Sequence, residues 1–301
     1  MSIKVLCIGD VMLDVVTKIA VLPKDINYGS DTASEISTHG GGAAANVASW
    51  LSQTQVSATI VGHVGNDAAG AALTSEFDAL GVHHENLMIE GARSGVVVVL
   101  VDPTGERTMF PDNGANSGLH IGDLPDLTGF DAVYISGYSP LDPQSLTGIK
   151  EMITEIRAAG ISIYFDPASV GAMKEVDINE VKSWLPSMNV LLLNEEEAIY
   201  LTGESDLEKA LDLLLVSSET VVIKRGSHGA IGKKRGSQSI SVAANAVTVI
   251  DTTGAGDSFA AGFISQFCIH GDLTRSLMAG AEIAAQCVAI IGARPRVGTK
   301  N

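Results

Sequence analysis

Short apolar segments rich in β-branched residues alternate with longer amphipathic segments along most of this chain, and this alternation limits the folds open to it. A short apolar run suits a strand buried on both faces, and the amphipathic stretch that follows suits a helix crossing back over the sheet. Right-handed crossovers of this kind build a mostly parallel sheet flanked by helices, so we predict an α/β fold. The expected strands cover 5–9, 58–64, 132–136, 161–166, 190–194 and 220–224, and the clearest helices cover 43–52, 68–80, 144–159 and 195–201.

Two segments do not follow this alternation. Residues 14–38 contain strand-like pieces but no helical pattern, and residues 94–113 resemble two strands joined by a Pro- and Gly-containing turn at 102–105. We predict that they form a small β-sheet that serves as a lid over a substrate. The alternative is an edge extension or a dimer contact only. The remaining residues form the α/β core for nucleotide and substrate: 1–13, 39–93 and 114–301.

Charge and cysteine content argue against several classes of partner. The 301 residues include 35 Asp and Glu against 19 Lys and Arg, which gives a formal net charge of −16. Nucleic acids and anionic membranes need a basic protein face, so we expect neither as a partner. The three cysteines are odd in number and share no metal-ligand spacing. They favour small buried side chains over a disulfide framework, and therefore a reducing, cytoplasmic location.

The segment richest in chemical information runs from Val249 to Gly262, where an apolar strand end leads through Asp-Thr-Thr-Gly-Ala-Gly-Asp into a helical run. Free backbone N–H groups at a helix start form an anion site, to which the helix dipole adds. Gly254 and Gly256 let the backbone approach a phosphate closely. The carboxylate of Asp257 suits a general base that takes the proton from an attacking hydroxyl. The alternative is a Gly-rich turn with Asp257 as the helix cap.

A second glycine-rich segment, GGGAAANVA, covers residues 40–48. Three glycines lead into a helix whose first turn is all alanine, so a ligand can lie against bare backbone. Asn46 offers a hydroxyl-rich ligand both a donor and an acceptor. The segment does not match the dinucleotide spacing G-x-G-x-x-G after the first strand, and residues 226–234 do not match a Walker P-loop, because Lys234 replaces the required Ser or Thr. An ATP site must therefore be built in another way.

The two motifs, in this order and near the two ends of the chain, resemble the signatures of the ribokinase-like (PfkB) carbohydrate kinase family. The second signature, residues 251–257, is the more specific of the two. The resemblance covers essentially the whole chain. It implies a Rossmann-like α/β domain with a β-sheet lid, a homodimer formed through that lid, and ATP- and Mg²⁺-dependent phosphorylation of a hydroxyl, normally a primary one.

The resemblance also implies roles for single residues on the acceptor side. Asp257 is similar to the catalytic base of the family, and its anion hole corresponds to Gly254, Ala255 and Gly256. The positions that match residues gripping substrate hydroxyls are Asp14, Gly41, Gly42 and Asn46. Asp10 and Asp14 form an acidic pair, of which one member could instead cap the neighbouring loop.

On the nucleotide side, the positions that match the family are Asn194, Lys224, Gly226, Ser227 and Gly229. Glu197 is similar to the residue that orders the water shell of Mg²⁺, an ion that prefers carboxylates held through water. For residues 194–197 the alternative is an acidic helix N-terminus, which is favourable by itself. The family's monovalent-cation loop, and with it a K⁺ site, corresponds to Asp251, Thr253 and Gly292.

The chain departs from the family pattern at several positions, of which three bear on the substrate and on the cation loop. Ala43 stands where ribokinases usually carry Lys, and Tyr138 lies near the position of a Glu, which argues against ribose itself. Arg296 stands where a small hydroxyl residue often completes the cation loop. A cationic side chain there would disturb the K⁺ site or replace the ion.

The small number of lid cations narrows the substrate class. A sugar phosphate needs Arg or Lys converging on its phosphate, and the basic residues that we consider in or next to the expected lid segments are Lys24, Arg93 and Arg107. We expect Arg107 to be an exposed lid charge and favour an unphosphorylated sugar or polyol. A nucleoside is the alternative substrate, with Tyr28 and Tyr138 as candidates for an aromatic slot. A non-catalytic small-molecule sensor and an oxidoreductase are less favoured, because the base is retained and the dinucleotide fingerprint is missing.

Overall fold

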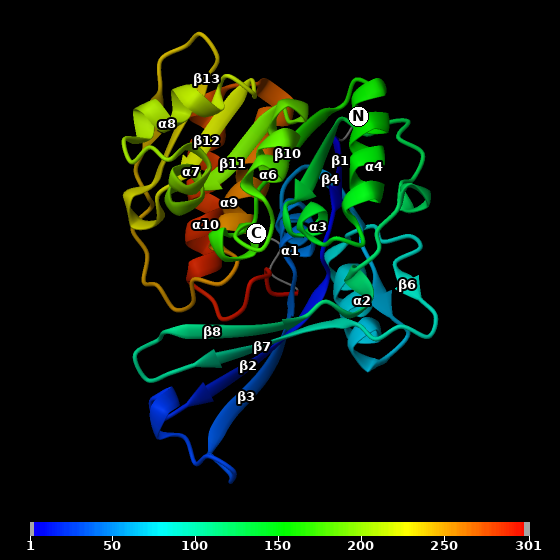
Figure 1. Ribbon diagram of the computed structural model, residues 1–301, viewed down its shortest axis with the longest axis vertical. Helices are drawn as coiled ribbons and strands as arrows, with labels where there is room; N and C mark the ends of the chain where they lie inside the picture. Colours follow the sequence, from blue (N-terminus) through cyan, green and yellow to red (C-terminus); the bar gives the residue numbers. More distant parts are fainter. Residues whose placement is uncertain (1–2, 298–301) are drawn as a thin grey trace.

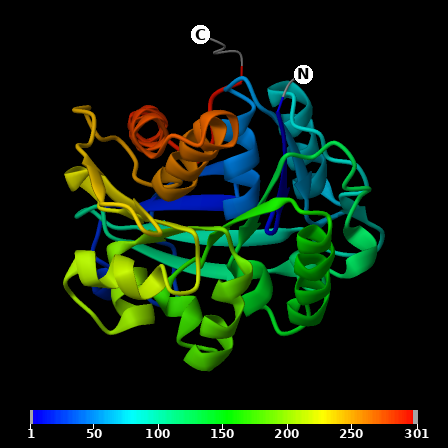
Figure 2. The same cartoon turned by 90° about the horizontal axis from the view of Figure 1, so that it is seen from above.

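The computed structural model describes residues 3–297. Within this range an eight-stranded sheet with helices on both faces forms the body of the molecule, and a separate four-stranded sheet projects from one end (Figure 1). Seen from above, α1, α9 and α10 lie on one side of the central sheet and α4, α6 and α8 on the other (Figure 2). The predicted fold class, a mostly parallel α/β sheet with a small additional sheet, is confirmed.

The central sheet has the strand order β14-β13-β12-β11-β10-β9-β1-β4. Its strands are β1 (Lys4–Ile8), β4 (Ser57–Val61), β9 (Ala132–Ser136), β10 (Ser162–Asp166), β11 (Val190–Asn194), β12 (Thr220–Lys224), β13 (Ala230–Lys234) and β14 (Ile240–Val242). All neighbours from β4 to β12 are parallel, while β13 and β14 add an antiparallel edge. The predicted strand at 58–64 is too long, because the chain leaves the sheet after Val61 and Val64–Gly65 form β5, which pairs with β6 (Met88–Ile89).

The helices cover both faces of this sheet and bury the strands from two sides. They are α1 (Ala43–Leu51), α2 (Ala68–Leu80), α3 (Tyr138–Leu141), α4 (Leu146–Ala158), α5 (Val170–Met173), α6 (Ile178–Trp184), α7 (Glu195–Thr202), α8 (Leu207–Leu214), α9 (Ala255–His270) and α10 (Leu273–Val288). Along β1, Val5 and Cys7 pack into one hydrophobic core and Leu6 and Ile8 into the other. Burying each such aliphatic side chain contributes about 1.5–3 kcal/mol, which explains why the central strands are apolar at consecutive positions.

The second sheet has the order β3-β2-β7-β8, formed by β2 (Met12–Ile19), β3 (Ser34–Gly41), β7 (Gly95–Val101) and β8 (Arg107–Asp112). We call this sheet the lid. The expected hairpin is present, with Val98 opposite Phe110 across β7 and β8. The expected segments 14–38 and 94–113 contain most of these strands, but β2 and β3 extend further, to the pair Met12–Gly41, where the chain enters from β1 and leaves toward α1.

The pleat of the lid gives its two faces different characters. Because side chains alternate along a strand, the register places Asp14, Val99 and Arg107 on one face. Val99 is buried, so this face turns toward the body. Val98 and Phe110 lie on the opposite face and are 39% and 56% exposed. The inward face of the lid thus carries Asp14 and Arg107 beside the buried Val99, while the outward face exposes Val98 and Phe110.

The structure also bears on the cysteines and on membrane insertion. Cys7, Cys268 and Cys287 are free thiols, and two of the three are buried. Burial raises the pKa of Cys268 to about 11 and that of Cys287 to about 12, so both stay protonated at neutral pH. Among residues 3–297 no helix combines the length and the apolarity that crossing a bilayer requires.

Candidate active site

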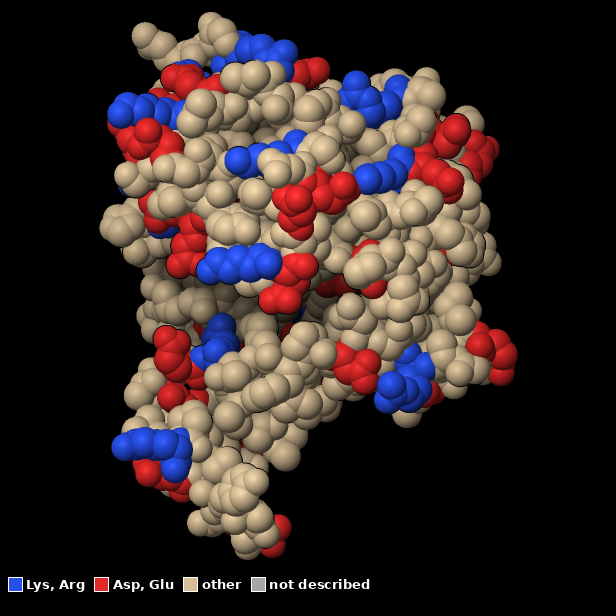
Figure 3. Space-filling model, in the orientation of Figure 1, with Lys and Arg blue, Asp and Glu red and all other residues tan. Residues whose placement is uncertain are grey.

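The carboxyl ends of the parallel strands meet the start of α9 and the inner face of the lid. Polar side chains stand at these strand ends: Asp10 after β1, Asp166 at the end of β10, Asn194 at the end of β11 and Lys224 at the end of β12. Ligands of open α/β sheets bind at this edge, next to the strand where the order reverses. Figure 3 shows a hollow between the body and the lid, with acidic and basic side chains at its margin.

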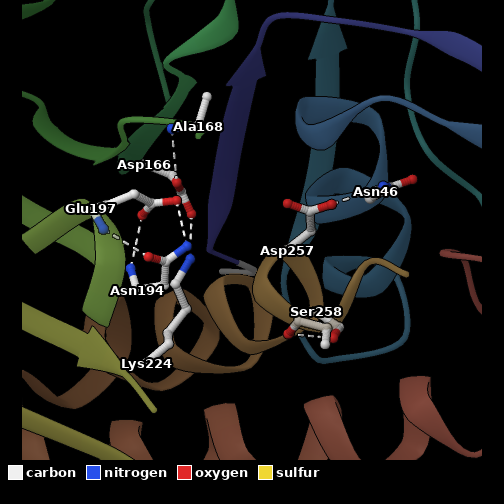
Figure 4. Close-up of polar contacts among 9 residues, drawn as sticks. Asn46, Asp166, Ala168, Asn194, Glu197, Lys224, Asp257 and Ser258 are labelled. Atoms are coloured by element: carbon white, nitrogen blue, oxygen red, sulfur yellow. Dashed lines mark hydrogen bonds and ion pairs between the residues drawn. The ribbon is translucent and has the colours of Figure 1, made fainter. Parts of the chain in front are cut away.

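Asp257 lies in the first turn of α9 and reaches back toward α1. The helix is preceded by Gly254 at φ +75°, where a Cβ would come within 2.7 Å of Ala293, so only glycine fits. The Asp257 carboxylate makes no capping hydrogen bond. Its Oδ2 instead accepts a hydrogen bond of 2.8 Å from Asn46 Nδ2 (Figure 4). The interpretation of Asp257 as a helix cap is therefore wrong.

The surroundings of Asp257 raise the pKa of its carboxyl group toward neutral pH. Burial raises its pKa to about 7, with a further upward contribution from Asp166 and Asp10. The hydrogen bond from Asn46 and the charge of Lys224 act in the opposite direction. A carboxylate with this pKa can both accept and release a proton near neutrality, which is what a general base needs.

Two glycines shape the pocket around Asp14. A Cβ on Gly41 would lie 2.3 Å from Asp14 Oδ1, so the carboxylate can occupy this place only beside a glycine. Gly42 has φ +91°, and a Cβ there would lie 2.4 Å from the carbonyl oxygen of Asp10. The predicted substrate residues of this segment thus pack against one another at the start of α1.

Asp10 and Asp14, the acidic pair after β1, make different contacts. Asp10 Oδ2 accepts a hydrogen bond of 2.7 Å from the amide of Ala43, so Asp10 is the member that caps α1. Asp14 is buried and makes no such contact. Burial raises the pKa of Asp14 to about 6, although the charge of Arg294 lowers it. Asp14 thus takes no part in capping α1 and can bind a ligand, and so can Asp10 Oδ1, which is buried without a hydrogen-bond partner among the described residues.

Arg294 is a site residue that the sequence analysis missed. Its guanidinium is buried and donates to Glu76 Oε2 at 2.6 Å, to the carbonyl oxygen of Gly41 at 2.6 Å and to Asn46 Oδ1 at 3.3 Å. These hydrogen bonds fix the positions of the Gly41 backbone and the Asn46 side chain. The available signal was a cation close to the predicted cation loop, but we considered only Arg296 there.

The expected acidic helix start at residues 194–197 is present. Asn194 and Glu197 form a reciprocal capping box: Asn194 Oδ1 accepts from the Glu197 amide at 2.8 Å, and Glu197 Oε2 accepts from the Asn194 amide at 2.8 Å. Asn194 Nδ2 also donates to Glu197 Oε1 at 2.6 Å. The interpretation of residues 194–197 as an acidic helix N-terminus is thus correct. The capping box holds the buried Glu197 carboxylate toward Lys224 (Figure 4).

Lys224 is paired with Asp166, which the sequence analysis did not select as a site residue. The Nζ atom donates to Asp166 Oδ2 at 2.5 Å. Burial works against its charge, but Asp166 and Glu197 raise the pKa of Lys224 above its ordinary value, so the lysine stays charged. A Cβ on Gly256 would lie 3.2 Å from Nζ. The lysine charge therefore stands directly beside the predicted anion hole.

The donor set fits Mg²⁺ only in its hydrated form. Among residues 3–297 no three His, Cys, Asp or Glu side chains are grouped so as to bind a metal ion directly. Asp166 and Glu197 nevertheless lie together at the strand ends, with burial and the charge of Asp166 raising the pKa of Glu197 to about 8. Two carboxylates that reach the ion through water, with phosphates completing the shell, suit the preferences of Mg²⁺.

The other predicted nucleotide residues lie in the loop between β12 and β13. Gly226 has φ +53° and Gly229 has φ +82°, and a Cβ on Gly229 would lie 2.0 Å from the carbonyl oxygen of Val242. Ser227 between them is exposed. The backbone thus requires both glycines, while contact of this loop with a nucleotide stays a prediction.

The residues of the expected cation loop also come together. Asp251 accepts hydrogen bonds from the amides of Thr253 at 2.8 Å and Gly292 at 3.1 Å. It also accepts one of 2.5 Å from Arg107 Nη2 of the lid. The prediction that Arg107 is an exposed lid charge is wrong, because its position on the inward face of β8 directs it to Asp251.

The tyrosines considered for an aromatic slot lie in different environments. Tyr28 is 97% exposed in the segment between β2 and β3 of the lid. Tyr138 begins α3 directly after β9 and is 42% exposed. Of the two, only Tyr138 is placed at the strand ends.

Comparison with known proteins agrees with this geometry. The family described as pfkB family carbohydrate kinase matches residues 2–299. The chain belongs to this family. The enzyme class expected from the sequence, an ATP-dependent carbohydrate kinase, is thereby confirmed. Among relatives of this PfkB kinase, an ATP-dependent ribose-1-phosphate kinase of Halopiger xanaduensis is 29% identical over 295 residues, which cover 97% of this chain and 93% of the relative.

Solved structures show the same fold. The adenosine kinase from Sinorhizobium meliloti matches with a TM-score of 0.88 and 23% identity, over 100% of this chain and 98% of the other. A structure from E. coli in complex with ATP and Mg²⁺ matches with a TM-score of 0.84 and 23% identity, over 97% and 94%. The fold is thus shared by proteins that differ in substrate, so the substrate must be argued from the site itself.

Proposed function

We propose that this PfkB kinase transfers the γ-phosphoryl group of ATP to a hydroxyl, normally a primary one, of an unphosphorylated sugar or polyol. The observation that carries the proposal is the hydrogen bond between Asn46 and Asp257. It joins the segment that would hold the substrate to the helix start that would hold the transferred phosphate. A hydroxyl bound by Asp14 would then face Asp257 and the anion hole together.

In the proposed mechanism Asp257 takes the proton from the substrate hydroxyl. The hydroxyl oxygen forms a bond to the γ-phosphorus in line, and the bond to the β,γ-bridging oxygen breaks, releasing ADP. The amides at the start of α9 and the charge of Lys224 compensate the charge on the phosphoryl oxygens. Mg²⁺, held through water by Asp166 and Glu197, would neutralise the phosphates. The lid would exclude water, which otherwise competes with the substrate.

Pairing of the nearby arginines supports an unphosphorylated substrate. Arg107 is bound to Asp251, and Arg294 to Glu76. Arg93, at the base of the lid, faces Asp112 at 3.3 Å. None of the three presents an uncompensated charge for a second phosphate group. The ribose-1-phosphate kinase relative makes a sugar phosphate the first competitor, and the adenosine kinase neighbour makes a nucleoside the second.

The test is release of ADP from Mg·ATP with a panel of free sugars, polyols, sugar phosphates and nucleosides, run with the wild type and with Asp257→Asn. We expect turnover on an unphosphorylated member of the panel and a loss of about 10³-fold in kcat for the variant, the scale of a lost general base. Turnover confined to a sugar phosphate or a nucleoside would contradict the substrate class. Equal turnover in the variant would contradict the role of the base.

The variant needs a folding control. The pKa of Asp257 is raised from 3.8 to about 7 in the folded protein, so ionising this buried carboxylate destabilises the fold. The stability of the wild type therefore falls as the pH rises through this range and stays lower above it. The amide does not ionise. We therefore expect Asp257→Asn to melt at or above the wild-type temperature at pH 8, which separates a catalytic defect from an unfolded protein.

The outward face of the lid supports a second part of the proposal, a homodimer. Ile36, Val98 and Phe110 share this face and are 64%, 39% and 56% exposed. A second copy of the same apolar face is the occupant we propose, since a twofold contact matches identical surfaces. Light scattering should give a dimer for the wild type and a monomer for Phe110→Asp. A monomeric wild type would contradict this part alone.

A further inference from the structure

Arg107 is the contact between the lid and the loop that leads into α9. It begins β8, and in Figure 1 this strand runs beneath the segment that descends to the start of α9. The guanidinium donates through Nη2 to Asp251 Oδ1 at 2.5 Å and through Nη1 to Thr252 Oγ1 at 2.9 Å. Only 24% of the Arg107 side chain and 13% of that of Asp251 are exposed, so water screens this pair less than a surface pair.

Asp251 organises the backbone around the predicted anion hole. Its Oδ1 accepts from the amide of Thr253, directly before Gly254, and its Oδ2 accepts from the amide of Gly292. Gly292 precedes Ala293, the residue against which Gly254 packs. Asp251 therefore joins the two loops on either side of the first turn of α9, and a positive charge on this carboxylate stabilises that arrangement.

A monovalent cation does not fit beside this arginine. Both oxygens of Asp251 already accept hydrogen bonds, and the guanidinium supplies a full positive charge in direct contact. The guanidinium would repel a second cation at the same carboxylate, because water screens this partly buried pair only in part. The cation loop implied by the family resemblance and the contacts of this chain therefore disagree.

We propose that Arg107 acts as a built-in cation, which takes the place of K⁺ at Asp251 and ties the position of the lid to the order of the anion-hole loop. Arg107 is then a positioning residue, because its side-chain contacts here are with Asp251 and Thr252 and its proposed effect passes through Asp251. Lid closure and assembly of the anion hole become one event, since the same contact belongs to both. Turnover by the wild type would not depend on the monovalent cation in the buffer.

The kinetic test compares wild type, Arg107→Ala and Arg93→Ala in the chlorides of K⁺, Na⁺ and choline. Arg93→Ala is the matched control, because it removes another arginine next to the lid, whose pair with Asp112 is largely exposed. We expect the wild type and the control to vary less than about twofold among the salts. Arg107→Ala should lose about tenfold or more in kcat/KM in choline and recover part of this in K⁺, the scale of one electrostatic contact. Wild-type activation by K⁺ of fivefold or more, or full turnover of Arg107→Ala in choline, would overturn the proposal.

Thermal melting without substrate tests the same contact independently, whereas the kinetic comparison rests on the proposed phosphoryl transfer. We expect Arg107→Ala to melt lower than the wild type in choline, and K⁺ to raise its melting temperature by on the order of 2 °C while leaving the wild type unchanged. A variant indifferent to K⁺ in both turnover and melting would overturn the replacement of the ion. If no substrate is found, the melting result still decides the question.

Discussion

The candidate site has a phosphate half, with Asp166, Glu197 and Lys224, and an acceptor half, with Asp14, Asn46 and Asp257. The charged groups of the two halves have different kinds of partner. On the phosphate half, Lys224 contacts Asp166 directly and lies beside Glu197, so one cation stands between two carboxylates. On the acceptor half, the direct partner of Asp257 is the neutral amide of Asn46. The first arrangement fixes the charge of the lysine, while the second leaves the pKa of Asp257 near 7.

This difference matches the two tasks of phosphoryl transfer. Phosphate oxygens carry charge throughout the reaction and need a cation that stays protonated, whereas the acceptor hydroxyl must lose a proton at one moment. Environments that separate the acidities of neighbouring groups are a common way to assign such roles. The comparison thus predicts that substitutions in the phosphate half change rates through charge, and those in the acceptor half through pH dependence or substrate binding.

The largest expected effect beyond loss of the base is that of Lys224→Met. Removing the ammonium leaves the buried Asp166 carboxylate without its cation, beside Glu197, and takes a positive charge from the anion hole. We expect kcat/KM to fall by about 10²–10³-fold, as for the loss of one preorganised donor. Steady-state kinetics with Lys209→Met as the control measures this, because the ion pair of Lys209 with Asp206 is exposed. A loss of less than tenfold would show that the lysine charge is dispensable.

The next effect concerns the pH profile of the wild type. Because Asp257 must be ionised to accept a proton and its pKa is raised to about 7, kcat/KM should fall about tenfold per pH unit below 7 and level off above it. Asp14, with a pKa of about 6, would steepen the lower part of this limb. Initial rates between pH 5 and 9 at saturating Mg·ATP test it. A flat profile down to pH 5 would contradict the difference between the two halves.

The parts of the fold and of the candidate site that consist of consecutive residues could be predicted from the sequence. Strands such as β11 (Val190–Asn194) were found because both faces are buried and every position before Asn194 is apolar. Asp257 and its glycines could be selected as candidates because a helix start, a phosphate loop and a base would be adjacent in the chain. The Asn194–Glu197 pair likewise carries the spacing of a capping box.

Contacts between distant segments had no such local signal. Asp166 and Lys224 are separated by 58 residues, and Arg294 and Glu76 by 218. Each of these residues taken alone looks like an ordinary charge at the end of a strand, on a helix or in a loop. The inward direction of Arg107 depends on the register of β7 and β8 and on the side of the lid that meets the body, and neither follows from the composition of the strand.

A smaller effect is expected for Gly41→Ala on the acceptor half. The new Cβ would lie 2.3 Å from Asp14 Oδ1 and must displace the carboxylate. We expect KM for the acceptor to rise by about tenfold with a smaller change in kcat, as for a loss of binding that is uniform along the reaction. Gly171→Ala is the matched control, since its Cβ would meet nothing closer than 3.9 Å. An unchanged KM would remove Asp14 from the substrate site.

The smallest and most discriminating effect is that of Asn46→Ala on the pH profile. The Asn46 hydrogen bond favours the ionised form of Asp257, so its loss should raise the pKa of Asp257 and move the acidic limb upward by about half a unit to one unit. At pH 9 the variant would then regain most of its relative kcat, because Asp257 is again ionised. A variant that is equally impaired at every pH would mean that Asn46 serves the substrate and not the base. The acceptor half would then resemble the phosphate half, with geometry rather than acidity as its function.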